Sequence, residues 1–224
     1  MESLAEIFTA AHVIRFIVET ITDLALLPSL DVVSRRGRHF EFFIGAFQFL
    51  ASTMYNMTDA LEVPMFLTPR DWHRLTNVLT ITYGLHLCIF LMGNRSEARD
   101  NFLRYLAFAL VWIAQIKDAY WMFQTQYTAY VVVFFLALPM LNMLLGSGLP
   151  VYNRPKVIRG FLALMVAGVC FYLGLDDEND AFRLFHGLSQ VVVGVALFYL
   201  WQAVPEDHYK KHDTPLPMQY RRYD

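Results

Sequence analysis

Three polar residues recur at helical spacing inside an otherwise apolar stretch. Ser52, Asn56 and Asp59 follow one another at i, i+4 and i+7, which places them on one face of a helix. A hydroxyl, an amide and a carboxylate on one face could support hydrolysis or bind a polar group. The alternative is that they only hydrogen-bond one helix to its neighbours, as polar residues often do in membrane bundles.

A second polar stripe lies near the N-terminus. His12, Arg15, Glu19 and Asp23 are spaced i, i+3, i+7 and i+11, and so also share one helix face. We expect Arg15 and Glu19 to pair along this face, because pairing lowers the cost of burying charge. The stripe would then face a partner subunit or a polar cavity. Alternatively, this stretch lies partly at the membrane interface.

Seven apolar blocks make up most of the chain and contain or adjoin these polar residues. Apolar residues make up 56% of the 224-residue chain, against about 45–50% in soluble proteins. They gather in blocks of about 17–23 residues, the length that spans a bilayer as a helix. We predict an all-α integral membrane protein with one seven-helix domain over residues 1–204 and a polar tail over 205–224. The predicted spans are Ile7–Leu30, Phe40–Thr58, Thr76–Met92, Phe102–Tyr120, Ala129–Leu145, Val157–Leu175 and Phe182–Val204.

The distribution of Lys and Arg predicts the orientation of the bundle. Thirteen of the 18 Lys and Arg residues fall in alternate loops and the tail, and basic loops stay on the cytoplasmic or matrix side. An N-terminus outside and a C-terminus inside follow from this alternation. The compartment stays open between the plasma or secretory membranes and the mitochondrial inner membrane. The sequence has no basic patch that would indicate nucleic-acid binding.

With this topology, polar residues of four spans fall at one depth, in the outer third of the bundle. They are Ser52, Asn56 and Asp59 in the second span, Asn77 in the third, Lys117 and Asp118 at the end of the fourth, and His186 in the seventh. We expect them to converge, with Asn56 donating a hydrogen bond to Asp59 and accepting one from His186.

The stretch Leu24-Ala25-Leu26-Leu27-Pro28-Ser29-Leu30, followed by Arg35, Arg36, His39 and Glu41, resembles myomaker-like proteins. These belong to the CREST superfamily of seven-span membrane proteins, with alkaline ceramidases, progestin and adipoQ receptors and GPI-processing phospholipases. The resemblance implies a zinc-hydrolase pattern: a serine, a histidine four residues on, a nearby aspartate, and a His-x-x-x-His pair on the last span. The zinc would activate water to cleave a lipid amide or ester.

This sequence departs from that pattern. Ser52, Asp59 and His186 match it. Asn56 stands where the pattern has the histidine four residues after the serine, and Phe182 stands at the first histidine of the pair on the last span. An acidic position of the close relatives holds Asn77. A catalytic zinc needs about three protein ligands, normally imidazole, thiolate or carboxylate. We therefore expect no zinc and no other cofactor.

These departures favour a non-catalytic membrane protein that interacts with lipids or with other membrane proteins, for example as a subunit of a larger complex. Its protein partners would bind the first span, through Arg15, Glu19 and Asp23, and the C-terminal tail. The alternative is a lipid hydrolase with an altered site built from Ser52, Asp59, Asp118 and His186. A receptor or transporter is less favoured, because the paired broken helices of inverted-repeat transporters are absent from the sequence.

Overall fold

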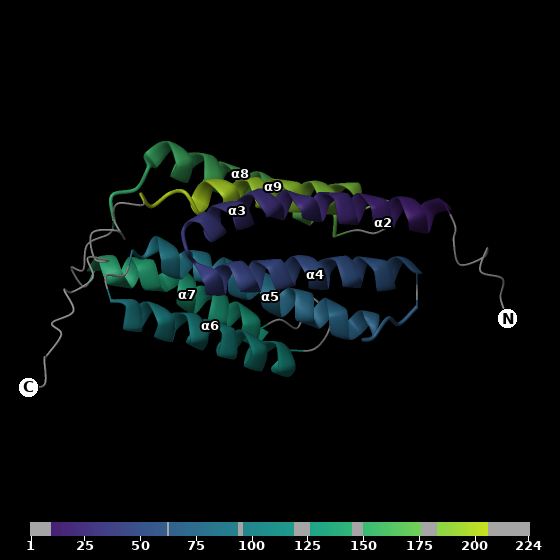
Figure 1. Ribbon diagram of the computed structural model, residues 1–224, viewed down its shortest axis with the longest axis horizontal. Coiled ribbons are helices and arrows are strands. Elements are labelled where there is room, and N and C mark those ends of the chain that lie inside the picture. Colours follow the sequence, from purple (N-terminus) through teal and green to yellow (C-terminus); the bar gives the residue numbers. More distant parts are fainter. Residues whose placement is uncertain are drawn as a thin grey trace, which may run out of the picture.

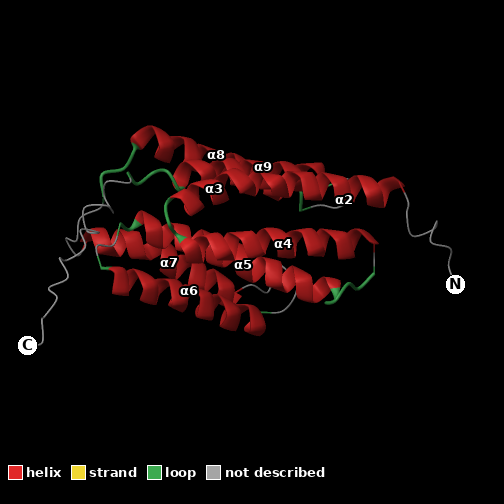
Figure 2. Cartoon of the chain, viewed as in Figure 1, coloured by secondary structure: helices red, strands yellow, loops and turns green. Residues whose placement is uncertain are grey.

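A computed structural model describes residues 10–61, 63–93, 96–118, 126–144, 150–175 and 183–205. Within these ranges the chain is all-α, as predicted, and contains no strand (Figure 2). In order, the elements are α2 (Ala10–Asp23), the short 3-10 helix η1 (Leu24–Leu26), α3 (Leu27–Arg35), α4 (His39–Leu61), α5 (Pro69–Leu91), α6 (Glu97–Lys117), α7 (Gln126–Leu144), α8 (Arg154–Leu173) and α9 (Leu184–Leu200).

The predicted first span is interrupted. The sequence predicts one helix over Ile7–Leu30, whereas α2, η1 and α3 follow one another as far as Arg35. Pro28 lies in the first turn of α3, where its missing N–H costs nothing, whereas in the middle of a helix it would clash with the preceding turn. The tighter turn η1 therefore precedes it.

Side-chain caps begin three of the helices earlier than their apolar residues suggest. Thr68, Ser96 and Asn153 each accept a hydrogen bond from the backbone N–H three residues ahead, at the starts of α5, α6 and α8. Such a cap satisfies a donor that the first helical turn leaves without a partner. As a result, α5 begins at Pro69, well before the predicted start of its span at Thr76.

The helices form two groups that face each other (Figure 1). One group holds α2, α3, α8 and α9, and the other holds α4, α5, α6 and α7. Contacts between the groups run mainly from α2 and α3 to α4. The outermost helices stay apart: α8 packs against α9, α7 packs against α5 and α6, and α7 and α8 make little or no contact with each other among the described residues.

Two glycines allow the closest helix approaches. A Cβ on Gly194 of α9 would lie 2.3 Å from the carbonyl oxygen of Ala25 in η1. A Cβ on Gly45 of α4 would lie 2.4 Å from the Leu30 side chain of α3. Small residues at such crossings let helix backbones come together.

The outer helices expose large apolar side chains. Leu144 of α7 is 82% exposed, and Tyr172 and Met165 of α8 are 74% and 70% exposed. By length and composition, α5 and α8 could each cross a membrane, while Gln126–Asn142 and Leu184–Leu200 are apolar but shorter. Soluble proteins rarely expose large contiguous apolar surfaces.

Candidate functional site

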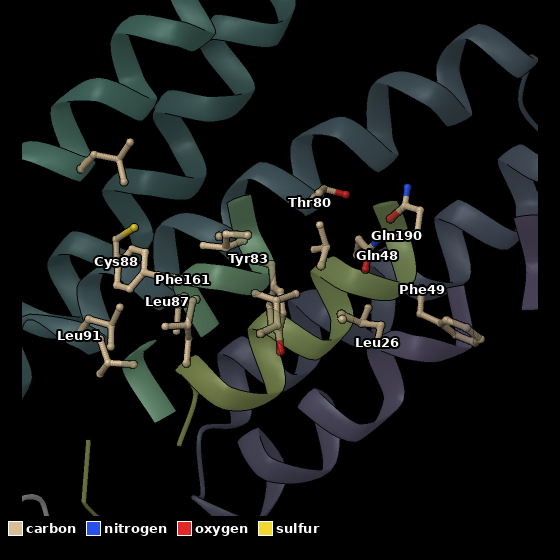
Figure 3. A pocket seen from close by; sticks show the side chains of 18 of the residues that line it. Leu26, Gln48, Phe49, Thr80, Tyr83, Leu87, Cys88, Leu91, Phe161 and Gln190 are labelled. Atoms are coloured by element: carbon tan, nitrogen blue, oxygen red, sulfur yellow. The ribbon is translucent and has the colours of Figure 1, made fainter. Parts of the chain in front are cut away.

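A cavity of about 630 Å³ lies between the two groups of helices (Figure 3). Its lining comes from α2, η1, α4, α5, α7, α8 and α9, together with Tyr152 just before α8. Ligand pockets in proteins usually have volumes of about 300–1,000 Å³. This cavity is therefore large enough for a small molecule or for part of a lipid.

One end of the cavity is polar. The polar lining residues are Thr22 and Asp23 of α2, Gln48 of α4, Thr80 of α5 and Gln190 of α9. Along both α5 and α9 the polar residue comes first, and the lining residues that follow are mainly apolar. In Figure 3, Gln48, Gln190 and Thr80 lie together, away from Leu87, Cys88 and Leu91. We call the five polar lining residues, Thr22, Asp23, Gln48, Thr80 and Gln190, the polar end.

The rest of the cavity is apolar and meets the gap between α7 and α8. Leu136 and Pro139 line it from α7, and Phe161 and Leu164 line it from α8. Among the described residues, α7 and α8 make little or no contact with each other, so the cavity is bordered there by two helices with exposed apolar faces.

Next to the polar end, four charged side chains join α2, α4 and the start of α9. Asp59 accepts from Arg15 at 2.7 Å, and Glu19 accepts from Arg183 at 2.9 Å. Arg15 also lies 3.5 Å from Glu19, and Arg183 lies 3.7 Å from Asp59. We call this set the Arg15 network. It contains two positive and two negative charges, so its formal charge is balanced.

A second network joins the opposite ends of the helices. Glu41 of α4 is fully buried and lies 3.0 Å from both Arg38 and Arg104. Asp100 of α6 pairs with the same two arginines. Nearby, the Tyr152 hydroxyl donates to the carbonyl oxygen of Leu91, and both residues line the cavity. Ion pairs thus tie the helices together beyond both ends of the cavity.

Residues 11–191 match the family described as "Protein of unknown function (DUF3522)". The chain belongs to the DUF3522 family. The match runs from α2 into α9 and so includes the Arg15 network and all of the polar end. No curated protein matches the chain. The DUF3522 description names no activity.

In this DUF3522 protein, the polar stripe of α2 turns toward the chain's own helices. Arg15 and Glu19 pair as predicted, and Glu19 is buried, with 3% of its side chain exposed. Arg15 keeps 26% of its side chain exposed while it contacts Asp59. Asp23 accepts a hydrogen bond of 2.9 Å from Asn56. The side chain of His12 lies outside the described residues.

The predicted cluster of Asn56, Asp59 and His186 has different contacts. Asn56 donates to Asp23 and not to Asp59, whose carboxylate is held by Arg15 and Arg183. Ser52 is buried beside the same Asp23 carboxylate. The His186 ring packs near Phe171 of α8, with 6.2 Å between ring centroids. The expected hydrogen bond from Asn56 to Asp59 was wrong, because the first helix supplies closer partners for both residues.

Asn77 and Asp118 have local contacts. Asn77 lies 3.5 Å from His73, one turn away on α5. Asp118 accepts from the backbone N–H groups of Tyr127 and Thr128 at 3.0 and 2.8 Å, at the start of α7. Because α6 packs on α5 and α7, Asp118 belongs with those helices. It is not part of the contacts that join α2, α4 and α9.

The residues present do not fit the zinc site that the sequence resemblance implies. Two guanidinium groups occupy the Asp59 carboxylate, and the amide of Asn56 is a poor zinc ligand. In the described part of the chain, no three His, Cys, Asp or Glu side chains are grouped to hold a metal ion. Phe182 lies outside the described residues.

Sequence reasoning missed most of the cavity lining. Gln48 and Gln190 are polar residues within apolar helices, and that signal could have identified them. Gln48 lies four residues before Ser52, on the same face of α4. The apolar residues of the lining carry no signal of their own, because the sequence around them is apolar throughout.

Proposed function

We propose that this protein crosses a membrane seven times and binds a lipid in the cavity between its two groups of helices, without hydrolysing it. The N-terminus would lie outside and the C-terminus on the cytoplasmic or matrix side. The observation that carries the proposal is the cavity itself, which has one polar end, an apolar remainder and an edge at the gap between α7 and α8.

The exposed apolar faces of α7 and α8 support a position within the bilayer. Among the described residues, side chains such as Met165 and Leu144 are 70% and 82% exposed. Hydrocarbon would surround them without the cost of exposing apolar surface to water. The predicted alternation of basic loops supplies the orientation, since Lys and Arg near span ends prefer the inner side.

The sparse contact between α7 and α8 in the described part of the chain supports a lipid ligand over a water-soluble one. Ion pairs join the helices beyond both ends of the cavity, whereas its side is bordered by two apolar helices that make little or no contact with each other among the described residues. In a bilayer, that side would face acyl chains. A lipid could therefore enter laterally and place its polar group at Gln48 and Gln190.

The contacts of the polar residues support a non-catalytic role. A hydrolase needs a nucleophile or an activated water beside a free base. The Asp59 carboxylate is bound by two arginines, and the Asp23 carboxylate accepts from Asn56. These contacts stabilise the bundle, and they leave Ser52 without a histidine base among its described neighbours.

A partner protein, if the chain is a subunit of a larger complex, would bind the tail over 205–224. The charges of Arg15, Glu19 and Asp23 already have partners within the chain, so a second protein is not needed to satisfy them. Residues 206–224 of the tail lie outside the described residues.

Filling the cavity tests lipid binding. Gly84 lines the cavity, and a Cβ there would meet nothing within 4 Å. We expect Gly84→Leu to fold normally, to project into the cavity and to displace lipid. The measurement is lipid extraction and mass spectrometry of the full-length protein after gentle purification, expressed as moles of each retained lipid per mole of protein.

Gly168 provides the matched control. It lies on α8, outside the cavity lining, and a Cβ there also meets nothing within 4 Å. Gly168→Leu should retain as much lipid as the wild type, and Gly84→Leu much less. Equal lipid content in all three proteins would contradict lipid binding in the cavity.

A further inference from the structure

Two amides at the polar end, that of the buried Gln48 and that of the half-buried Gln190, have no hydrogen-bond partner in the described part of the chain. The side chains of Gln48 and Gln190 both reach the cavity, and no hydrogen bond within the described residues uses either of them. Gln48 is only 9% exposed. A buried amide without a hydrogen bond is costly, so such groups nearly always have a partner. These amides are therefore placed to bond a ligand.

An amide can both donate and accept hydrogen bonds. Each carries an N–H₂ donor and a carbonyl acceptor, and Thr80 adds a hydroxyl to the same lining. A ligand group that matches this set must itself donate and accept. Hydroxyl and amide groups do so, whereas a phosphate or an ammonium offers mainly one of the two.

The charge of the lining excludes an anionic group. Among the described residues that line the cavity, none is Lys, Arg or His, and the only ionisable residue at the polar end is Asp23. Both arginines of the neighbouring Arg15 network are bound to Glu19 and Asp59. A phosphate or carboxylate would thus be buried beside a carboxylate without a counter-ion, which is strongly unfavourable.

Asp23 already has partners of its own. Its carboxylate accepts from Asn56 at 2.9 Å and has Ser52 beside it. These contacts satisfy much of its hydrogen-bonding capacity without any ligand, so it does not need a cation in the cavity.

From these observations we propose that the cavity selects a lipid whose polar end is uncharged and carries hydroxyl or amide groups, held by Gln48 and Gln190. The inference rests on the proposed function, because it specifies the head group of the lipid that the cavity would bind. The chain of that lipid runs past Cys88 toward Leu91 and the gap between α7 and α8.

Cys88 offers a direct readout of occupancy. It lines the apolar part of the cavity, and the only other cysteine of the chain, Cys170, lies on α8 outside the lining. In full-length Cys170→Ser protein in phosphatidylcholine nanodiscs, a membrane-soluble maleimide would modify Cys88 alone. A bound lipid slows this modification.

Three probes with a matched oleoyl or oleyl chain separate the head groups. They are 1-monooleoylglycerol, which is neutral; 1-oleoyl-lysophosphatidic acid, which has the same glycerol with a phosphate; and oleylamine, which is cationic. We expect monooleoylglycerol to protect Cys88 at concentrations at least about 10-fold lower than either charged lipid, a difference in binding free energy of about 1.4 kcal/mol.

The outcomes distinguish the two proposals. Equal or better protection by lysophosphatidic acid, or by oleylamine, overturns head-group selection and leaves lipid binding in place. Protection by none of the three overturns both. Gln48→Leu/Gln190→Leu removes the two amides but keeps Asp23, so it should need clearly higher concentrations of monooleoylglycerol for the same protection. Gln126→Leu, which replaces an exposed glutamine at the start of α7, should protect as the wild type does. Unchanged protection by monooleoylglycerol in the double variant also overturns the proposal.

Discussion

Asn56 of α4 donates a hydrogen bond of 2.9 Å to Asp23 of α2. Both residues are buried, with 6% and 7% of their surfaces exposed. The bond joins two helices that lie side by side in Figure 1, and Asp23 also lines the cavity. The amide therefore fixes the carboxylate at the polar end of the cavity.

Asn56→Leu should destabilise the protein. It removes the donor and leaves the buried Asp23 carboxylate with fewer hydrogen bonds, at a cost of about 1–3 kcal/mol. The measurement is the midpoint of thermal unfolding in detergent. Asp23→Leu/Asn56→Leu removes both partners and should recover part of the loss, because the Asp23 carboxylate that lacked its hydrogen bond is then removed as well. A double variant less stable than Asn56→Leu would contradict this account.

Glu19→Ala should destabilise the protein by about 3 kcal/mol, the lower end of the range for breaking a buried ion pair. The side chain of Glu19 is 3% exposed and binds both arginines of the Arg15 network, while Asp59 remains to bind them in the variant. Asp31→Ala is the control, since the Asp31–Arg35 pair is largely exposed and should contribute less than about 1 kcal/mol. Similar losses in denaturant unfolding of the two variants would contradict burial of the network.

Gly194→Ala should destabilise the crossing of α9 and η1. The added methyl would lie 2.3 Å from the backbone carbonyl oxygen of Ala25, and backbone moves away less easily than a side chain. Overpacking of this kind costs about 1–3 kcal/mol. Gly168→Ala adds the same methyl in open space and should be neutral or stabilising. A thermal unfolding midpoint for Gly194→Ala at or above the wild-type value would refute the close approach.

Cysteine labelling in intact cells should reveal the orientation. Phe66, between α4 and α5, is 96% exposed, and Arg35 at the end of α3 has a side chain that is 77% exposed. In the proposed topology, a membrane-impermeant maleimide reaches Phe66→Cys from outside and reaches Arg35→Cys only after the membrane is permeabilised. The reverse pattern would rule out an N-terminus outside.

The sequence predicted the positions of the helices in the chain better than the contacts between them. Long apolar blocks identify helices because each block is a property of a continuous segment, and the Arg15–Glu19 pair was predictable because both residues lie on one helix. Pairs between helices need lateral positions. The predicted depth in a bilayer is only one coordinate. It placed Asp118 at the same level as His186, although Asp118 lies at the end of α6, which packs on α5 and α7.

The candidate site was only partly predictable. Ser52, Asn56 and Asp59 were identified as polar residues on one face, and two of them contact Asp23 or lie beside it. The cavity was not foreseen, because a space between helices depends on how they pack and not on any single residue. Gln48 and Gln190 were not predicted, because neither belongs to the hydrolase pattern that the sequence resembles.

The most direct test of lipid binding is an electron cryomicroscopy structure of the full-length protein in lipid nanodiscs. We predict elongated density inside the cavity, with its compact end at Gln48 and Gln190 and its tail passing Cys88 toward the gap between α7 and α8. A cavity closed by direct packing of Phe161 against Leu136, or one that holds no density beyond the protein, would contradict the account.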